Sequence, residues 1–180
     1  MKALKWTLII LGILALTAYF GFGYLKTQTK KASPEETVNF QDGDLKMSVF
    51  YCRPFKKERE IFGGLVPYGE VWRTGANEAS TFTTSQEINF GGEFLKAGTY
   101  TLWTIPGEDE WSVILNSKMY DWGVDFSSKA LREAEFDVVK VNVPTWPVPT
   151  GVIEQFTIRF GDNGFLILEW DETRVEVPIG

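Results

Sequence analysis

Beyond residue 38, apolar and polar residues alternate along most of the chain with a period of two. The alternation is clearest in runs that span 45–53, 99–105, 139–143, 155–160, 165–170 and 174–177. Adjacent residues of a β-strand point to opposite faces of a sheet, so this period predicts half-buried strands. The run FLILEW at 165–170 is almost continuously apolar, which predicts a strand in the centre of the fold.

The segments between these runs are rich in residues that favour turns. FGGE at 90–93, IPGEDEW at 105–111 and FGDNGF at 160–165 are each expected to join antiparallel neighbours. A parallel sheet would need crossover helices, which the pattern does not contain. We expect one short helix at 128–136, with Ser128 as its N-cap. The predicted fold is all-β, an antiparallel β-sandwich or jelly-roll-like domain of eight or nine strands.

A different pattern occupies the N-terminus, where the residues from Trp6 to Leu25 carry no charge. A helix of about twenty residues is roughly 30 Å long, which is enough to cross the hydrocarbon core of a bilayer. Lys2 and Lys5 also fit the charged region of a signal peptide, so cleavage stays open as an alternative. Because the run is longer than a usual signal core and lacks a clear A-x-A site, we favour an uncleaved transmembrane anchor.

The predicted organisation is an anchor or signal peptide at 1–25, a flexible polar tether at 26–37 and a β-sandwich domain at 38–180. After residue 25 the chain has 16 basic and 24 acidic residues, a formal charge of −8. Such a surface repels phosphate backbones, so nucleic-acid binding is not expected. A short N-terminus normally stays in the cytoplasm, so we expect a single-pass membrane protein whose domain lies on the outer, periplasmic side of the inner membrane.

The composition excludes whole classes of chemistry. The chain has no histidine, which removes Ser-His-Asp and Cys-His catalysis. Its single cysteine, Cys52, cannot form an intrachain disulfide and does not supply a structural zinc site. No P-loop, dinucleotide fingerprint or EF-hand loop is present. We therefore expect no metal and no cofactor.

Candidate chemistry gathers in the aperiodic stretch EVWRTGANEAS at 70–80. A strand does not enclose Gly75 between polar groups such as Arg73, Asn77 and Glu78 unless the backbone bends sharply there. We expect Asn77 to satisfy amides of the loop. We expect the carboxylate of Glu78 to pair with the guanidinium of Arg73 or Arg53.

Arg53 enters this hypothesis because of its place in the alternation. It continues the apolar line of the 45–53 run, so its guanidinium is expected at the rim of the core, where an unpaired charge is very costly. The network then has two interpretations. It either locks the loop onto the sandwich, or it lines a pocket in which the arginines bind an anionic group and Tyr51 or Trp72 stacks on the ligand.

The chain also resembles a known bacterial family. Four segments resemble its hallmark motifs: YCRPFKKEREIFGGLVPYGEVWRTGANEASTFTT, GGEFLKAGTYTLWTIPGEDEWSVILN, EQFTIRF and LEWDETRVEVPI. They appear in order, together with the pair Trp122-Gly123, over about residues 45 to 178. The family is DUF2911, a domain of unknown function, whose usual pattern is Tyr-Ser-Arg-Pro where this chain has cysteine at position 52.

The resemblance implies an envelope protein with a signal peptide or anchor, and it implies no activity. It also implies that one site contains six residues of this chain, namely Tyr51, Arg53, Trp72, Arg73, Asn77 and Glu78.

Three functions remain open. The favoured one is a non-catalytic binding or structural module, with a small anionic or sugar-like molecule as its ligand. The second is a hydrolase or lyase in which Glu78 is a general acid or base and an arginine stabilises negative charge. The third is an assembly subunit of an envelope complex that binds its partner through Trp111, Trp122 and Trp146.

Overall fold

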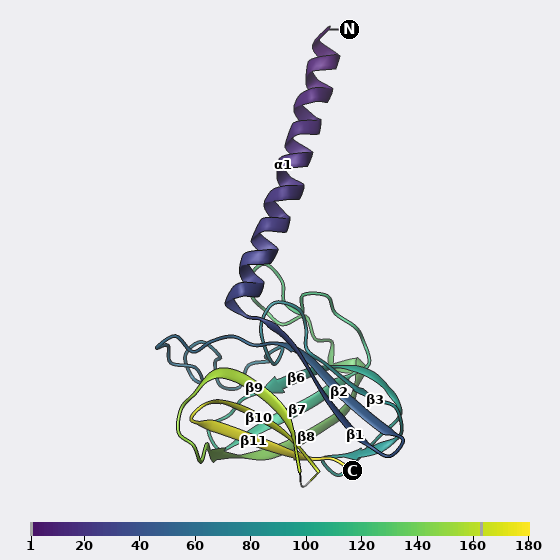
Figure 1. The fold of residues 1–180 in the computed structure, drawn as a ribbon, viewed down its shortest axis with the longest axis vertical. Coiled ribbons are helices and arrows are strands. Elements are labelled where there is room, and N and C mark those ends of the chain that lie inside the picture. Colours follow the sequence, from purple (N-terminus) through teal and green to yellow (C-terminus); the bar gives the residue numbers. More distant parts are fainter. Residues whose placement is uncertain (1, 163) are drawn as a thin grey trace. The chain divides into compact units, whose positions relative to one another are not determined.

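The computed structural model describes residues 2–162 and 164–180. The chain divides into two compact units, Met1–Ala32 and Ser33–Gly180, which are described separately below. The first unit is a single helix, and the second contains all the strands (Figure 1).

The first unit is the helix α1, which spans Lys2–Ala32. Its segment Leu4–Gly21 is long and apolar enough to cross a membrane, a property that signal sequences near an N-terminus share. The helix is longer than the predicted anchor. Residues 26–32 belong to its last two turns and residues 35–37 to the first strand, so regular secondary structure occupies most of the segment 26–37 for which we expect a polar tether. The Lys, Gln and Thr residues at 26–32 are compatible with a solvent-exposed helix, so they continue the helix that the preceding apolar run forms.

The described residues of the second unit form eleven strands, and all the pairings of these strands are antiparallel. Nine strands form one sheet in the order β1-β2-β3-β6-β7-β8-β11-β10-β9, and β4 and β5 form a separate hairpin. The bounds are β1 Glu35–Asp42, β2 Leu45–Cys52, β3 Thr81–Thr84, β4 Ile88–Phe90, β5 Glu93–Leu95, β6 Gly98–Ile105, β7 Glu110–Asn116, β8 Asp137–Pro147, β9 Ile153–Gly161, β10 Phe165–Asp171 and β11 Thr173–Pro178. The predicted antiparallel all-β fold is confirmed.

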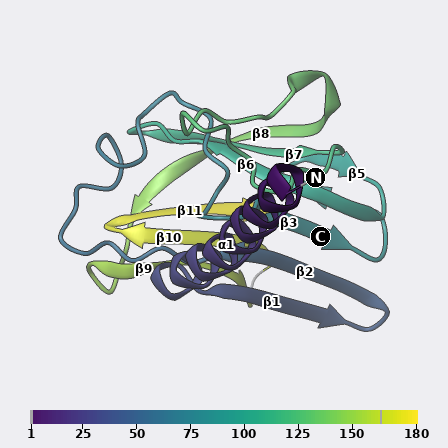
Figure 2. The same ribbon diagram turned by 90° about the horizontal axis from the view of Figure 1, so that it is seen from above.

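The nine-stranded sheet curves until its two edge strands approach each other, so that it is nearly closed (Figures 1 and 2). The ring of Phe40 on β1 lies 5.5 Å from that of Phe160 on β9. The hydroxyl of Tyr51 on β2 accepts a hydrogen bond from the backbone N–H of Ile158 on β9, at 2.9 Å. Closure of this kind shields the edge strands from pairing with other chains.

The interior of the sheet is packed with the apolar residues that the alternation predicts. Five aromatic rings meet at one end of this core, and Trp72 stacks on Trp170 with centroids 6.0 Å apart. Phe62, Trp111 and Phe156 complete the group. Trp111 is only 2% exposed, so its expected role at a partner surface is wrong, whereas Trp122 and Trp146 are 38% and 54% exposed.

A second, smaller cluster is buried on the outer face of the sheet. Cys52, Trp103 and Ile114 alternate with core residues along β2, β6 and β7, yet none of the three is exposed to solvent. Two loops cover them. One is the 70–80 loop, and the other, at 117–133, places the ring of Tyr120 5.3 Å from that of Trp103. The outer face of the sheet is therefore buried at the edge where these loops meet.

The expected helix at 128–136 is wrong. Ala130 forms an isolated bridge with Val124, and only Ala134–Phe136 form a turn of 3-10 helix. Ser128 has a φ of +67°, which a helix does not allow. The side chain of Asp125 accepts hydrogen bonds from two backbone N–H groups downstream of it, at 2.8 and 3.0 Å. This local turn fixes residues 125–129 in a conformation that is not helical.

Candidate functional site

The 70–80 loop runs over the outer face of the sheet and has two parts with different surroundings. Trp72 exchanges two backbone hydrogen bonds with Thr104 of β6, at 2.7 and 3.0 Å, which fixes the start of the loop. Residues 70–72 line an open cavity. Most of residues 74–80 are buried, including Thr74, Asn77 and Ser80.

The buried part contains the sharp bend that the sequence predicts. Thr74, Gly75 and Asn77 have φ values of +55°, +149° and +55°. At Gly75 a Cβ atom would lie 2.9 Å from the carbonyl oxygen of Cys52, so a side chain does not fit without movement of the backbone. The N–H of Ala76 donates to the same carbonyl at 3.2 Å. The bend brings the following residues, including Glu78, over the end of β2.

Arg53 lies at the rim of the core, and its acid partner is Glu36 on β1. A guanidinium nitrogen lies 2.5 Å from the Glu36 carboxylate. The same guanidinium donates to the carbonyl of Phe156 at 3.1 Å and to the hydroxyl of Thr157 at 2.9 Å. Arg53 therefore joins both edge strands of the sheet, β1 and β9.

Tyr51 belongs to the same group. Its hydroxyl lies 3.2 Å from the Glu36 carboxylate and is bonded to the backbone of Ile158. Burial raises the pKa of this phenol far above its ordinary value of 10, so the group stays a neutral hydroxyl. Tyr51, Arg53 and Glu36 thus form a network inside the closing seam of the sheet.

Cys52 points to the opposite face, towards Glu78. Its thiol donates to the Glu78 carboxylate at 3.4 Å. Burial raises the pKa of the thiol to about 11, and the neighbouring Glu78 charge acts in the same direction. A thiol with this pKa is protonated at neutral pH and is a poor nucleophile.

Arg73 and Asn77 complete the outer group. Arg73 donates to the carbonyl of Trp122 at 3.0 Å, and its guanidinium lies 5.8 Å from the centre of the Trp122 ring. Burial lowers the pKa of Arg73, while the charge of Glu78 acts against that shift. The amide of Asn77 donates to the carbonyl of Ser33 at 3.2 Å. This group ties the first residue of the unit to both covering loops.

The structure thus divides the six predicted residues between three places. Tyr51 and Arg53 lie in the seam with Glu36, and Trp72 lies in the aromatic cluster of the core. The other three, Arg73, Asn77 and Glu78, lie with Cys52 on the outer face.

Sequence reasoning missed Glu36, because residues 26–37 were assigned to a tether. The available signal was the alternation of Glu36 with Val38 and Phe40, which places all three on one face of a strand.

Glu35, Cys52 and Glu78 offer ligand atoms that lie within 4.8 Å of one another. Metal ions bind the deprotonated thiolate of cysteine, so an ion at this point would have to displace the thiol proton. The guanidinium of Arg73 interacts with Glu78 and competes with a cation for that carboxylate. We assign no metal ion to this cluster.

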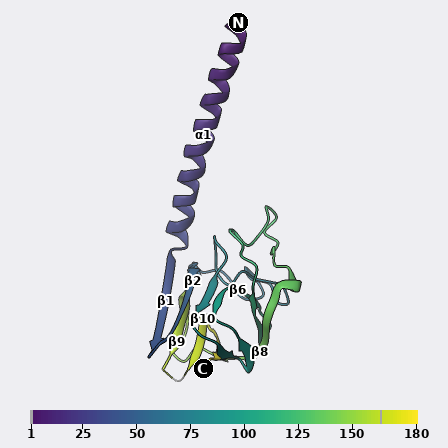
Figure 3. The ribbon, with the colours of Figure 1, turned by 90° about the vertical axis from the view of Figure 1, so that its right-hand side faces the viewer.

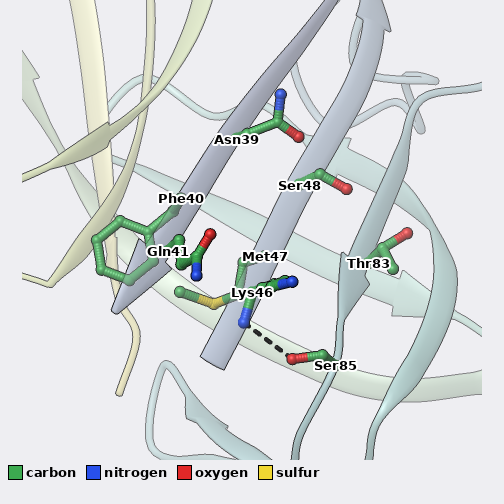
Figure 4. A pocket seen from close by; sticks show the side chains of 8 residues that line it. All are labelled: Asn39, Phe40, Gln41, Lys46, Met47, Ser48, Thr83 and Ser85. Carbon is green, nitrogen blue, oxygen red and sulfur yellow. Dashed lines mark hydrogen bonds between the residues drawn. The ribbon is translucent and has the colours of Figure 1, made fainter. Parts of the chain in front are cut away.

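Among the described residues, a groove and a cavity are open to a ligand. A shallow groove of about 420 Å³ crosses the outer face of β1, β2 and β3, where Asn39, Ser48 and Thr83 lie in register (Figure 4). A cavity of about 470 Å³ lies between residues 65–72 and 127–132. Six of the eleven residues that line the cavity are apolar and five are polar, a mixture that is typical of small-molecule sites, whereas six of the eight residues that line the groove are polar.

The cavity, which we call the 65–72/127–132 cavity, has Leu65, Val66, Pro67, Val71, Trp72 and Ala130 as apolar lining residues. Its polar lining consists of Glu70, Ser127, Ser128, Lys129 and Arg132. Arg132 is held by Asp137 through two hydrogen bonds, at 3.0 and 2.5 Å. Lys129 is exposed to solvent.

Comparison with known proteins places the strand-containing unit in a family. Neither the curated proteins nor the solved structures contain a match to the chain. The family model described as "Protein of unknown function (DUF2911)" matches residues 33–179, which is nearly the whole second unit. The order of motifs, the antiparallel strands and this match agree, and the chain belongs to the DUF2911 family.

Proposed function

We propose that the protein is a membrane-tethered binding module of the bacterial cell envelope, with its domain on the periplasmic side of the inner membrane. The tether is supported by the apolar segment Leu4–Gly21 of α1. The single observation that carries the binding role is the 65–72/127–132 cavity. Its volume of about 470 Å³ lies within the range of small-molecule sites.

The lining favours a ligand with an apolar body and one anionic group. Trp72, Val71 and Leu65 offer apolar surface, and Lys129 offers positive charge, beside Arg132, which is paired with Asp137, and the carboxylate of Glu70. Arg132 is oriented by Asp137, which limits the entropy that is lost when its planar group binds an anion. A small carboxylate with an aromatic or aliphatic body matches both the apolar and the positively charged lining residues of the cavity.

A binding role accounts for the chemistry better than catalysis does. The Cys52 thiol is protonated at neutral pH, and Glu78 lines neither of the two hollows described above. The contacts of Arg53, Tyr51, Cys52 and Glu78 join strands and loops of the fold. We therefore assign a structural role to those residues and the binding role to the cavity.

Photolabelling with 4-benzoylbenzoate, which carries a carboxylate on an apolar photoreactive body, tests the binding role. The full chain in bacterial membranes is irradiated with the probe, and the labelled peptides are mapped by mass spectrometry. We expect label within 65–72 and 127–132, competition by unlabelled benzoate, and a several-fold loss in Lys129→Ala.

The matched control is Lys140→Ala, which removes an exposed lysine of β8 and should leave the labelling unchanged. Label spread over the surface, with the same yield in Lys129→Ala as in the control, would contradict the proposal.

A further inference from the structure

The loop at 117–133 exposes four large apolar side chains on one short stretch of chain. They are Met119, Trp122, Phe126 and Leu131, with exposed fractions of 53%, 38%, 112% and 45%. Single apolar residues on a surface are ordinary, but a group of this kind marks a surface that contacts something else. We call these four residues the apolar tip.

The loop holds these side chains outward through a defined set of hydrogen bonds. The carboxylate of Asp125 accepts from the backbone of Ser127 and Lys129, which turns the chain around Phe126. The N–H of Leu131 donates to the carbonyl of Gly123 at 2.9 Å. At the base of the loop, the amide of Asn116 donates to the carbonyl of Glu133 at 2.8 Å.

The register of the sheet places the apolar tip at the edge of the domain where the chain enters. A row of paired residues crosses the strands through Thr37, Phe50, Thr81, Thr101 and Asn116. The start of β1 therefore lies at the same edge as the end of β7, from which the loop departs. Figure 3 shows the loop, in green, extending beyond the strand ends at that edge.

Two hydrogen bonds of the 70–80 loop support the same placement. Asn77 of the 70–80 loop bonds the carbonyl of Ser33, and Ala79 of that loop donates its N–H to the carbonyl of Asp121 at 3.1 Å. A single covering loop thus connects the first residue of the domain to the loop that bears the apolar tip.

The distance along the chain to the apolar run is short. Seven residues, 26–32, separate Leu25 from Ser33, and all seven are helical. At 1.5 Å per residue a helical segment of seven residues is about 10 Å long, slightly more than the roughly 5–8 Å of headgroup region on each side of a bilayer. An apolar loop at the edge where the chain enters the domain is then close enough in chain length to reach the interface, where tryptophan and other aromatic side chains settle.

We propose that the apolar tip inserts into the interfacial region of the lipid bilayer. This inference rests on the proposed function, in which the helix α1 anchors the chain in the membrane. The attraction is apolar rather than electrostatic, because the cations of the loop are offset by nearby anions. The cations are Lys118, Lys129 and Arg132, and the anions are Asp121, Asp125, Glu133 and Asp137. A zwitterionic phosphatidylcholine bilayer is therefore sufficient.

The test places a fluorescent NBD group on Phe126→Cys in the full chain, in a Cys52→Ser background. The matched control is Phe94→Cys, which replaces another exposed phenylalanine, 60% exposed, on the β4–β5 hairpin. Both proteins are reconstituted in phosphatidylcholine nanodiscs with and without headgroup-nitroxide lipid. We expect a blue-shifted emission and several-fold quenching by the nitroxide at position 126, and neither effect at position 94.

The other outcomes separate this inference from the tether. If the chain remains with the nanodisc and the probe at 126 is as unquenched as the probe at 94, the insertion is overturned and the tether stands. A blue shift without nitroxide quenching assigns the tip to a protein contact and also overturns the insertion. If the chain does not remain with the nanodisc, both proposals fail. Should Cys52→Ser destabilise the fold, the native residue is retained, because its thiol is buried.

Discussion

At the scale of single residues, the contact between Cys52 and Glu78 shows how a reactive group becomes a structural one. The thiol is fully buried beneath the 70–80 loop and donates to the Glu78 carboxylate. Both burial and the negative neighbour favour the protonated form, so the pKa moves to about 11. A serine at this position, as in the usual family pattern, would offer the same donor to the same acceptor.

We predict that Cys52 reacts slowly with iodoacetamide in the folded protein. At pH 8 its thiolate fraction is about a hundredfold lower than that of the same thiol in the unfolded chain, before any protection by burial is counted. The rate is measured by mass spectrometry on the full chain, with and without denaturant. Rapid modification of the folded protein at pH 8 would rule out the buried, protonated thiol.

The same pKa has a consequence for stability. The unfolded thiol loses its proton near pH 9.0 and the folded thiol near pH 11, so the contribution of this group is complete below pH 9 and declines as the pH rises towards 11. Cys52→Ser removes this titration, because a serine hydroxyl stays protonated over that range.

At the scale of elements, the seam between β1, β2 and β9 depends on polar groups rather than on a continuous ladder. Tyr51 on β2 reaches across to the backbone of Ile158 on β9, and Arg53 bonds Glu36, Phe156 and Thr157. The ion pair of Arg53 with Glu36 is partly exposed, so its own contribution is modest. The buried hydroxyl of Tyr51 contributes more, because its loss leaves a backbone N–H without a partner.

We predict that Tyr51→Phe lowers the free energy of unfolding by about 1–3 kcal/mol, the cost of a buried donor left unsatisfied. Urea denaturation of the full chain in nanodiscs measures the difference. The matched control is Tyr100→Phe, whose hydroxyl donates to the exposed carbonyl of Lys96, and which should cost about 0.5 kcal/mol or less. Equal losses in the two variants would contradict a special role for the seam.

At the scale of the whole molecule, the chain combines an apolar helix with a domain that carries an acidic surface. The helix contains one candidate span, and the residues after position 25 carry a formal charge of −8. An acidic domain is repelled by the anionic headgroups of a bacterial membrane. In our proposal, stable association with the membrane therefore depends on the apolar helix, to which the apolar tip adds a second contact.

We predict that the full chain stays in the membrane fraction after alkaline carbonate extraction. Leu14→Arg should release a substantial part of it, because a charge at the centre of a span costs about 2.5–3.5 kcal/mol of insertion free energy.

Protease added to spheroplasts should digest the domain if it lies on the outer side. A soluble product that begins after residue 25 would contradict the anchor and indicate a cleaved signal peptide.

The sequence predicted those parts of the fold and site that depend on neighbours along the chain. Alternation placed Met47, Val49 and Tyr51 on the core face of one strand, and all three are buried there. The bend at Gly75 followed from the residues around it. The helix expected at 128–136 failed because the turn around Asp125, three residues before its start, fixes residues 125–129 in a conformation that is not helical, with a φ of +67° at Ser128.

The partners within the candidate site could not be predicted in the same way. Glu36 was assigned to a tether, yet it meets Arg53 because β1 pairs with β2 over its whole length. Glu78 was expected to pair with an arginine, and the bend also brings it to Cys52. The chain has many acidic residues. Which of them meets a given arginine or the thiol depends on how the loops and strands pack together.

The sequence by itself determined the apolar helix, the faces of the strands, the turns and the absence of histidine chemistry, because each depends on residue type and local period. Only the tertiary structure decided the closure of the sheet by β1 and β9, the burial of Cys52 on the outer face and the position of the cavity between two distant loops. These features arise when segments far apart in the chain meet, as the pairs Asn77–Ser33 and Tyr51–Ile158 do, at separations of 44 and 107 residues. No local pattern encodes which of them will touch.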